Sequence, residues 1–204
     1  MTGKLEGFQS ISTNTTTNPY CIKQNKKKDN NICTFCYSHT MLNTFRKNMA
    51  PSLQRNSDLL SSKVLHPDAL PVVNQAFFRF NSHGELDLDK KKATINLINY
   101  INIAIKNPHC NFALWTKRFD IVSKYFKNNE KPKNLILVYS NPRINHILDK
   151  APQYFDKTFN NVEEHLEVNR QNCTGQKCKD CLLCYKFNGV STIVEKVKSY
   201  GKKK

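Results

Sequence analysis

The chain has 204 residues, of which 39% are hydrophobic, so it is long enough to bury one core, with at most a small appended module. No apolar run approaches the roughly 20 residues that a membrane span needs, so we expect no membrane partner. Lys and Arg number 32 against 16 Asp and Glu, a formal net charge of +16. Such a basic surface favours nucleic acid as a partner, and a bias of the composition toward Lys and Asn is the alternative explanation.

The chain has eight cysteines, and their chemistry depends on the compartment in which the protein works. The first residues, Met-Thr-Gly-Lys-Leu-Glu-Gly-Phe, lack the apolar segment of a secretory signal, so we expect a cytoplasmic protein. In such a compartment thiols ligate metals rather than forming disulfides. The cysteines are therefore candidate metal ligands.

The first part of the chain combines an irregular segment with three cysteines. Residues 1–18 are rich in Ser, Thr, Asn and Gly without periodicity, and we expect an irregular arm there. Cys21, Cys33 and Cys36 follow in a CX11CX2C spacing, with a Lys- and Asn-rich loop in the long interval and Phe35 between the last two. These three thiols are expected at the mouth of the fold.

Helical periodicity begins after the third cysteine. Apolar residues recur at helical intervals from Tyr37 until Ala50-Pro51 interrupts the pattern, and a second helix is expected over 52–60. Two prolines, Pro67 and Pro71, frame a connector. The sequence then changes from helices to alternating strands and helices.

Three strand–helix units follow the connector. The expected strands are 76–80, 111–116 and 135–140. The expected helices are about 90–106, 118–127 and 144–148. A last amphipathic helix is expected over about 190–200. Uninterrupted apolar strands that alternate with helices predict a parallel sheet buried on both faces.

The predicted fold class is therefore α/β, a partial (β/α) barrel or open parallel sheet with cysteine-rich N- and C-terminal segments. We expect an arm over 1–18, a core with the N-terminal cysteine loop over 19–170, and a C-terminal cysteine cluster and helix over 171–204. Function collects at the carboxyl ends of parallel strands, and the expected ends are polar. Three basic residues there are either contacts for an anionic substrate or solvated surface charges: Lys117, Arg118 and Arg143.

Four cysteines lie within twelve residues near the C-terminus, in a CX4CX2CX2C spacing: Cys173, Cys178, Cys181 and Cys184. Two CX2C steps bring successive sulfurs around a common centre, as a tetrahedral metal ion or an iron–sulfur cube requires. Cysteines only three residues apart make poor disulfide partners, and a redox disulfide or free thiols are the alternatives. The four ligands suit either a [4Fe-4S] cluster or a zinc ion.

The N-terminal cysteines leave more than one arrangement open. Three thiolates suit a cube with one open iron, whereas a closed zinc site needs a fourth ligand such as His39. One cluster shared between these three cysteines and a single C-terminal cysteine is a further arrangement. The number of clusters, one or two, therefore stays open. Cys110 has no cysteine nearby in the sequence, and we expect an ordinary buried thiol.

The segment 33–37, Cys-Thr-Phe-Cys-Tyr, resembles the end of the CX3CX2C motif of radical S-adenosylmethionine enzymes. This resemblance implies a partial (β/α) barrel and a [4Fe-4S] cluster whose open iron takes the amino-acid part of S-adenosylmethionine. In that family a Gly-Gly-Glu motif at the next strand end binds the methionyl amino group. The turn 82–85, Ser-His-Gly-Glu, occupies a comparable place, which implies Ser82, Gly84 and Glu85 as cofactor-binding residues.

The sequence departs from that motif in two places. Eleven residues separate Cys21 from Cys33 instead of three, and His83 stands where the family has its first glycine. The chain is more similar to a small phage family known as gene product 88, which has cysteines at both ends and a strand-end Ser/Gly motif between them. That family looks like a shortened relative of the same barrel. This resemblance covers about residues 20–185 and implies a phage protein in the host cytoplasm.

The sequence thus predicts an iron–sulfur protein that acts as a cluster-bearing binding, sensor or electron-transfer protein. A radical enzyme that uses S-adenosylmethionine is one alternative, and a zinc-stabilised nucleic-acid-binding protein is another. In an enzyme, Glu85 and His83 are candidate general bases. Otherwise they are a loop carboxylate and an exposed imidazole. The sequence indicates neither a substrate nor an oligomeric state.

Overall fold

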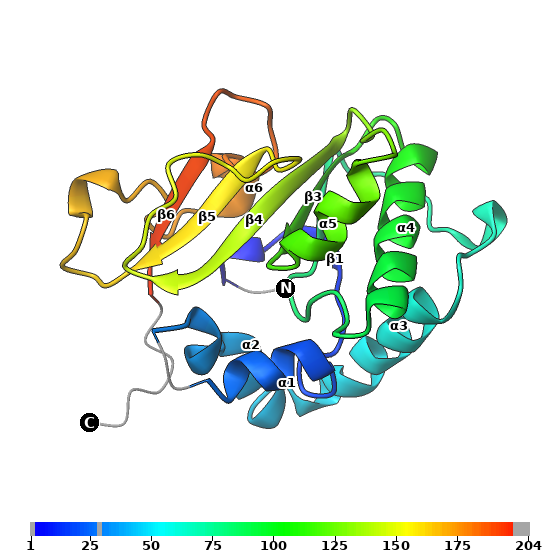
Figure 1. Cartoon of the computed structure of the whole chain (residues 1–204), viewed down its shortest axis with the longest axis horizontal. Coiled ribbons are helices and arrows are strands. Elements are labelled where there is room, and N and C mark those ends of the chain that lie inside the picture. Colours follow the sequence, from blue (N-terminus) through cyan, green and yellow to red (C-terminus); the bar gives the residue numbers. More distant parts are fainter. Residues whose placement is uncertain (1–2, 28–29, 198–204) are drawn as a thin grey trace.

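Six strands form one parallel sheet whose spatial order follows the chain order, from β1 to β6 (Figure 1). The computed structural model describes residues 3–27 and 30–197. Within these ranges β1 and β6 do not pair, so the sheet is open and does not close into a barrel. The strands are β1 Gln9–Ile11, β2 Phe77–Phe80, β3 Asn111–Thr116, β4 Leu135–Ile144, β5 Lys157–Val162 and β6 Thr192–Lys196.

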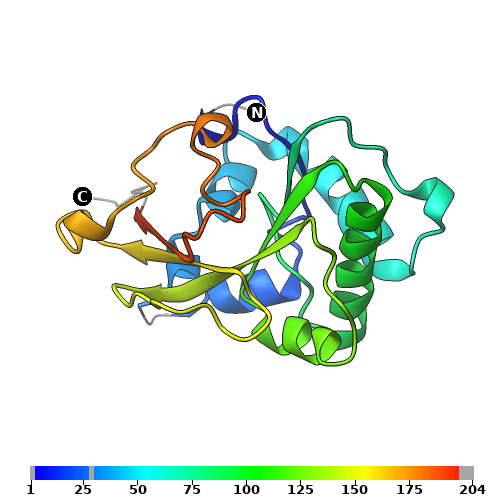
Figure 2. The same ribbon diagram turned by 90° about the horizontal axis from the view of Figure 1, so that it is seen from above.

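Helices lie on both sides of this sheet. They are α1 Pro19–Asn25, α2 Tyr37–Asn43, α3 Ala50–Ser62, α4 Lys90–Lys106, α5 Phe119–Phe126 and α6 Cys178–Cys181. Helices α4 and α5 cover one face, with α3 beside α4, whereas α6 lies on the other face (Figures 1 and 2). The predicted α/β class with an open parallel sheet is confirmed. None of the helices in the described ranges is both long enough and apolar enough to cross a membrane.

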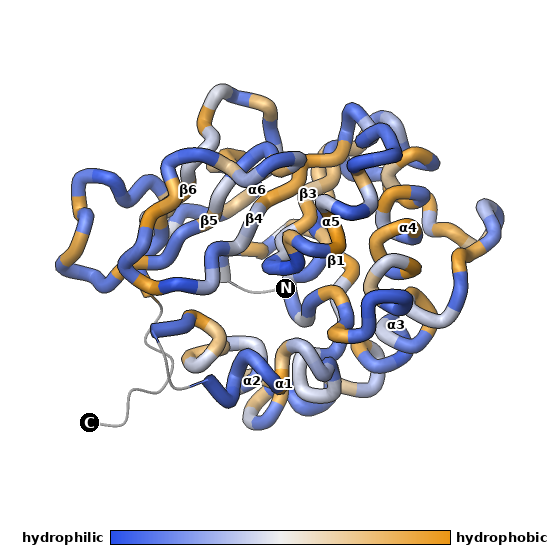
Figure 3. The backbone as a smooth tube through the Cα atoms, viewed as in Figure 1, coloured by the Kyte–Doolittle hydropathy of each residue, from blue (hydrophilic) through white to orange (hydrophobic). Residues whose placement is uncertain are grey.

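The central strands bury side chains on both faces, as a parallel sheet between two layers does. The face toward α4 and α5 carries the larger core, to which β3 and β4 contribute Phe112, Leu114, Leu135 and Leu137. The opposite face carries a smaller cluster with Ala113, Trp115, Ile136 and Val138 from the same two strands. Figure 3 shows the hydrophobic stretches along β3, β4 and α4, with mainly hydrophilic loops around them.

The strongly periodic segments form the predicted elements. Helix α4 and strand β3 have the expected bounds, while β2 and α5 lie within the predicted ranges. Helix α4 begins where the Asp89 carboxylate accepts a hydrogen bond from the Lys92 N–H at 2.9 Å. The expected helix over 52–60 is present within α3, but Ala50-Pro51 does not interrupt a helix as predicted. Helix α2 already ends at Asn43, and α3 begins at Ala50 because a proline is tolerated in the first turn.

The third unit differs from the prediction, because no helix forms over 144–148. Strand β4 continues past Pro142 to Ile144, where it pairs with Asn161 of β5 after a shift of register. Asn145 then adopts a positive φ of 59°, and its N–H donates to the Asn161 carbonyl at 2.9 Å. Pairing with β5, a strand that the sequence analysis did not identify, therefore replaces the expected helix.

The two ends of the chain also differ from the prediction. The expected irregular arm contains β1, which pairs with β2 in parallel. The expected helix over 190–200 is strand β6 over Thr192–Lys196, and its last residues, 198–200, lie outside the described ranges. Ile193 and Val194 are buried in the sheet, so a short apolar pair that suits a helix is used by an edge strand. The division into three segments stays a prediction.

Candidate metal and cofactor site

The N-terminal cysteines follow β1, at the carboxyl edge of the sheet. The Asn18 side chain accepts a hydrogen bond from the Cys21 N–H at 3.1 Å, which places Cys21 in the first turn of α1. Asn31 accepts in the same way from the Cys33 N–H at 2.9 Å and starts a short 3-10 helix. Cys36 ends that turn and immediately precedes α2. Two asparagine caps thus fix the backbone of this cysteine loop.

The three N-terminal thiols lie near one another in a buried setting. Burial raises the pKa of the Cys21 and Cys33 thiols, and the proximity of Cys36 raises both further. The Lys117 ammonium acts in the opposite direction and lowers the pKa of both thiols. This lysine therefore favours the thiolate form that a metal or a cluster requires.

The C-terminal cysteines lie on the face of the sheet opposite α4. Cys178 and Cys184 pack against the cluster that contains Trp115 and Tyr185. Cys173 forms a parallel bridge with Glu195 of β6, and the Lys4 ammonium donates to its sulfur at 3.4 Å. Burial raises the pKa of all three of these thiols. Helix α6 and strand β6 thus hold the group against the sheet.

All three N-terminal cysteines and three of the four C-terminal ones line one cavity of about 870 Å³ at this end of the sheet, whereas Cys181 does not line it. The cysteines that line it are Cys21, Cys33, Cys36, Cys173, Cys178 and Cys184. His39, the candidate fourth ligand for zinc, lines it as well. Cys110 belongs instead to the core on the other face and is fully buried, as expected, so burial raises its pKa to about 12. The fold therefore separates Cys110 from the other cysteines.

The candidate ligands are of the chemical type that binds a metal ion or an iron–sulfur cluster, because they are cysteine thiols. All eight cysteines are free thiols, so the structure contains no disulfide bond between them. Thiolate sulfur is the ligand that iron–sulfur clusters and structural zinc prefer. In the described ranges, however, no group of three His, Cys, Asp or Glu side chains is arranged so that it could hold a metal ion. The ligand types therefore fit a metal or cluster, while the structure shows no assembled ligand set among these residues.

The turn over 82–85 follows β2 and lines the same cavity. Gly84 has a φ of +78°, and a Cβ atom there would lie 2.0 Å from the Thr13 Oγ1 and 2.6 Å from the Thr13 carbonyl oxygen. The Gly84 N–H donates to the Thr15 Oγ1 at 2.8 Å, and the Ser82 and Ser12 hydroxyls are 2.6 Å apart. The turn is therefore fastened to the segment after β1, and only glycine fits at its centre.

Glu85 is buried and its carboxylate links β2 to β3. Its Oε1 accepts from the Leu86 N–H at 2.9 Å and from the Thr116 hydroxyl at 2.5 Å. Its Oε2 accepts from the Lys117 N–H at 2.8 Å. A carboxylate can accept about four hydrogen bonds, so Oε2 keeps capacity for another donor. The loop carboxylate predicted from the sequence thus also has a structural role.

His83 is not the exposed imidazole of the structural alternative, because only 6% of its surface is accessible. Its Nδ1 lies 2.7 Å from the Ser38 hydroxyl. Burial lowers the pKa of His83 to about 4, and the nearby Arg46 and Arg79 cations lower it in the same direction. The imidazole is therefore neutral near pH 7.

The basic residues at the strand ends have different environments. Lys117 is half-buried, and its ammonium donates to the Ser140 hydroxyl at 3.1 Å. Burial lowers the pKa of Lys117, but Cys33 and Glu85 together raise it above its ordinary value. Arg118 forms an ion pair with Asp120 at 2.8 Å, whereas Arg143 is exposed. Of the three, only Lys117 lies at the cysteines.

Arg79 is one of several residues lining the cavity that the sequence analysis did not identify. It is the one charged residue in the apolar run Phe77-Phe78-Arg79-Phe80. Its guanidinium lies over the Trp115 ring, with 4.0 Å from its central carbon to the ring centroid. The signal was the strand alternation, which puts Arg79 on the face opposite to Phe78 and Phe80.

Comparison with known proteins gave one match. A family model described as gene product 88 matches residues 12–172, about four fifths of the chain. The matched segment contains the N-terminal cysteines and the turn over 82–85, and it ends one residue before Cys173. No curated protein matches, and no solved structure matches.

Proposed function

The chain belongs to the gene product 88 family, and we propose that it is an iron–sulfur protein that binds one or two [4Fe-4S] clusters. One observation carries this proposal. Cysteines from the two ends of the chain line a single cavity at the carboxyl edge of a parallel sheet. Unrelated surface or core thiols have no reason to collect in this way, as Cys110 illustrates.

The environment of the thiols supports the same proposal. Metal ligation needs thiolates, and burial alone opposes them by raising the pKa of the thiol. Each cysteine group has a nearby cation that opposes this effect, Lys117 for Cys33 and Arg79 for Cys178. A bound cluster would supply one-electron transfer. We therefore propose a cluster-bearing binding, sensor or electron-transfer protein, of phage origin and working in the reducing host cytoplasm.

Zinc is the alternative metal for the same ligands. The four C-terminal cysteines form a complete ligand set for either metal, and His39 lies in the cavity beside the three N-terminal ones. Anaerobic purification with measurement of iron, zinc and acid-labile sulfide separates the two. We expect a brown protein with iron and sulfide in comparable amounts. A colourless protein with stoichiometric zinc and no sulfide would contradict the iron–sulfur proposal.

Single substitutions connect the metal to the proposed ligands. We expect Cys178→Ser, Cys181→Ser and Cys184→Ser to lower metal content and melting temperature, because metal binding is coupled to folding. Cys110→Ser is the matched control, since that thiol is buried in the other core and contributes only packing. Equal metal content in all four variants would contradict the assignment of ligands.

A second candidate function is a radical enzyme that uses S-adenosylmethionine. The observation in its favour is that the turn with Ser82, Gly84 and Glu85 lines the same cavity as the N-terminal cysteines. Glu85 keeps hydrogen-bonding capacity at Oε2 for an amino group, although three donors already bind its carboxylate. These three hydrogen bonds indicate that the Glu85 carboxylate already has a structural role.

Electron paramagnetic resonance of the reduced protein tests this second candidate. An enzyme should change its spectrum when S-adenosylmethionine is added and should form 5′-deoxyadenosine, and Glu85→Gln should weaken both effects. An unchanged spectrum without 5′-deoxyadenosine would leave the cluster-bearing binding protein as the function.

A further inference from the structure

Arg79 is a half-buried cation without a carboxylate partner among the described residues. Three of the lysines that line the cavity have acidic partners: Lys4 pairs with Glu195, Lys177 with Glu6 and Lys196 with Glu164. The groups that act on the charge of Arg79 are instead Tyr185, Tyr37, Cys178 and Cys184. Removing part of a charge from water is costly unless it is paired, so an anion formed within this set or bound beside it would stabilise Arg79.

The Arg79 guanidinium is held in place from one side by an aromatic surface. It lies over the Trp115 ring, and Trp115 packs against Tyr185 with their ring centroids 5.4 Å apart. Its Nε–H is buried and has no hydrogen-bond partner. A guanidinium that lies over an aromatic ring keeps its N–H groups in its own plane, where they remain available to an acceptor beside it.

Tyr185 presents a second unsatisfied donor in the same place. It directly follows Cys184, is 1% exposed, and packs on Phe8 with a centroid distance of 4.3 Å. Its hydroxyl is buried and meets no hydrogen-bond partner at ordinary distance and angle. The Arg79 guanidinium is close enough to act on it, and a phenol oxygen that accepts from Arg79 still has its own O–H to donate. That O–H and the Arg79 Nε–H are therefore two donors available to an acceptor.

We propose that Arg79 and Tyr185 position and stabilise the metal centre of the C-terminal cysteines. In this arrangement Arg79 supplies a positive charge and N–H donors, and Tyr185 supplies an O–H donor, to the sulfur atoms of Cys178 and Cys184. This inference rests on the proposed function and names the residues around the ligands. Such outer partners orient metal ligands and tune a cluster through charge and hydrogen bonds to its sulfurs.

The surroundings of the two cysteines fit this role. Cys178 and Cys184 pack against the same aromatic cluster that holds Arg79 and Tyr185. Arg79 lies over the ring of Trp115, a member of that cluster, so its positive charge is placed on the side of the sheet that carries these two cysteines. Removing Arg79 would therefore leave thiolates in an apolar site without this counter-charge.

The test uses the full chain with Arg79→Met, Arg79→Lys and Tyr185→Phe, loaded with iron and sulfide, or with zinc if the wild type takes up zinc. The rate of metal transfer to a chelator is measured for each protein. We expect a rate about 10- to 100-fold faster for Arg79→Met, partial recovery with Arg79→Lys, and a smaller increase for Tyr185→Phe. With iron–sulfur loading, the reduction potential of Arg79→Met should be more negative, because a cation that stabilises the reduced cluster is lost.

Two controls separate this role from a general loss of charge or fold. Lys131→Met removes another half-buried cation, whose ion pair is with Asp156 at 2.8 Å, and should leave the transfer rate unchanged. Measuring all variants again with Cys33→Ser assigns the effect to the C-terminal group. Melting of the metal-free proteins shows whether Arg79→Met still folds. If it does not, the transfer rate of Arg79→Lys is compared with that of the wild type instead.

The outcomes distinguish this inference from the proposed function. A wild type that binds metal through the C-terminal cysteines, with Arg79 variants of unchanged transfer rate and potential, would overturn the inference alone. A wild type that binds no metal would overturn the proposed function, and the inference with it.

Discussion

At the scale of single residues, His83 links the burial of the cavity wall to pH. Its pKa is about 4 in the folded chain, against an ordinary value of 6.5. Between these values the unfolded chain binds a proton that the folded chain does not, so stability falls as the pH falls from about 6.5 to about 4. Above pH 6.5 both states hold the neutral imidazole and the effect is absent.

We expect the wild type to lose about 2 kcal/mol of unfolding free energy between pH 7 and pH 5 through this residue. Denaturant unfolding of the metal-free protein at both pH values measures the loss. His83→Gln is the matched variant, because its amide can still bond Ser38 but does not titrate. If both proteins show the same pH dependence, the folded chain binds a proton at His83 as readily as the unfolded chain does, and the pKa of His83 is not lowered by folding.

At the scale of elements, the turn over 82–85 joins the ends of β1 and β2, and Gly84 is its tightest point. A side chain at Gly84 meets the Thr13 backbone, whereas one at Gly189, whose φ is also positive at +73°, meets nothing within 4 Å. We expect Gly84→Ala to cost about 3 kcal/mol or more, and Gly189→Ala only about 1 kcal/mol. Thermal melting of the two variants measures this difference. Equal melting temperatures would mean that the turn can move away from Thr13.

The elements also show what the sequence can and cannot predict. Helix α4 and strand β3 are predictable because a long apolar period and a buried apolar run are local signals. Strand β5 is not, because its sequence Lys-Thr-Phe-Asn-Asn-Val is polar. Its buried Lys157 and Asn160 are satisfied by Asn188 and Asn141, which only the folded chain brings near. Strand β1 is three residues long and carries no period at all.

The candidate site likewise has a part that the sequence predicts and a part that only the fold reveals. The cysteine groups are found from their spacing, since CX2C steps are local. The environment of Arg79 depends on Trp115 and Tyr185, which are distant in sequence and meet only because α6 packs against β3. The unpaired charge of Arg79 is therefore a tertiary property that the sequence analysis had no means to detect.

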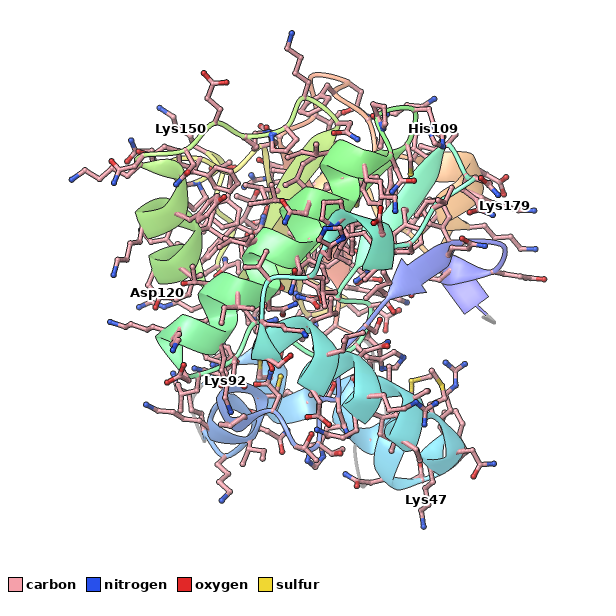
Figure 4. All side chains as sticks on the ribbon, turned by 90° about the vertical axis from the view of Figure 1, so that its right-hand side faces the viewer. Lys47, Lys92, His109, Asp120, Lys150 and Lys179 are labelled. Carbon is pink, nitrogen blue, oxygen red and sulfur yellow. The ribbon has the colours of Figure 1, made fainter. Side chains whose placement is uncertain are left out.

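At the scale of the whole molecule, the net charge of +16 is spread over several elements. In Figure 4, Lys47, Lys92, Lys150 and Lys179 lie at separate edges of the molecule. A spread of this kind brings few lysines to any one stretch of duplex. Phosphate contacts confer affinity without sequence preference, because each one releases condensed counterions.

We therefore expect weak, sequence-independent binding to a DNA duplex that involves about four phosphates and falls roughly 100-fold between 50 and 200 mM salt. Fluorescence anisotropy with two duplexes of unrelated sequence measures both properties. Lys47→Glu and Lys150→Glu, on different edges of the molecule, should each weaken binding only slightly. If one of them abolishes binding while the other has no effect, the protein has a single dedicated nucleic-acid face. If no binding is detected at 50 mM salt, the charge reflects the Lys- and Asn-rich composition, and the nucleic-acid alternative fails.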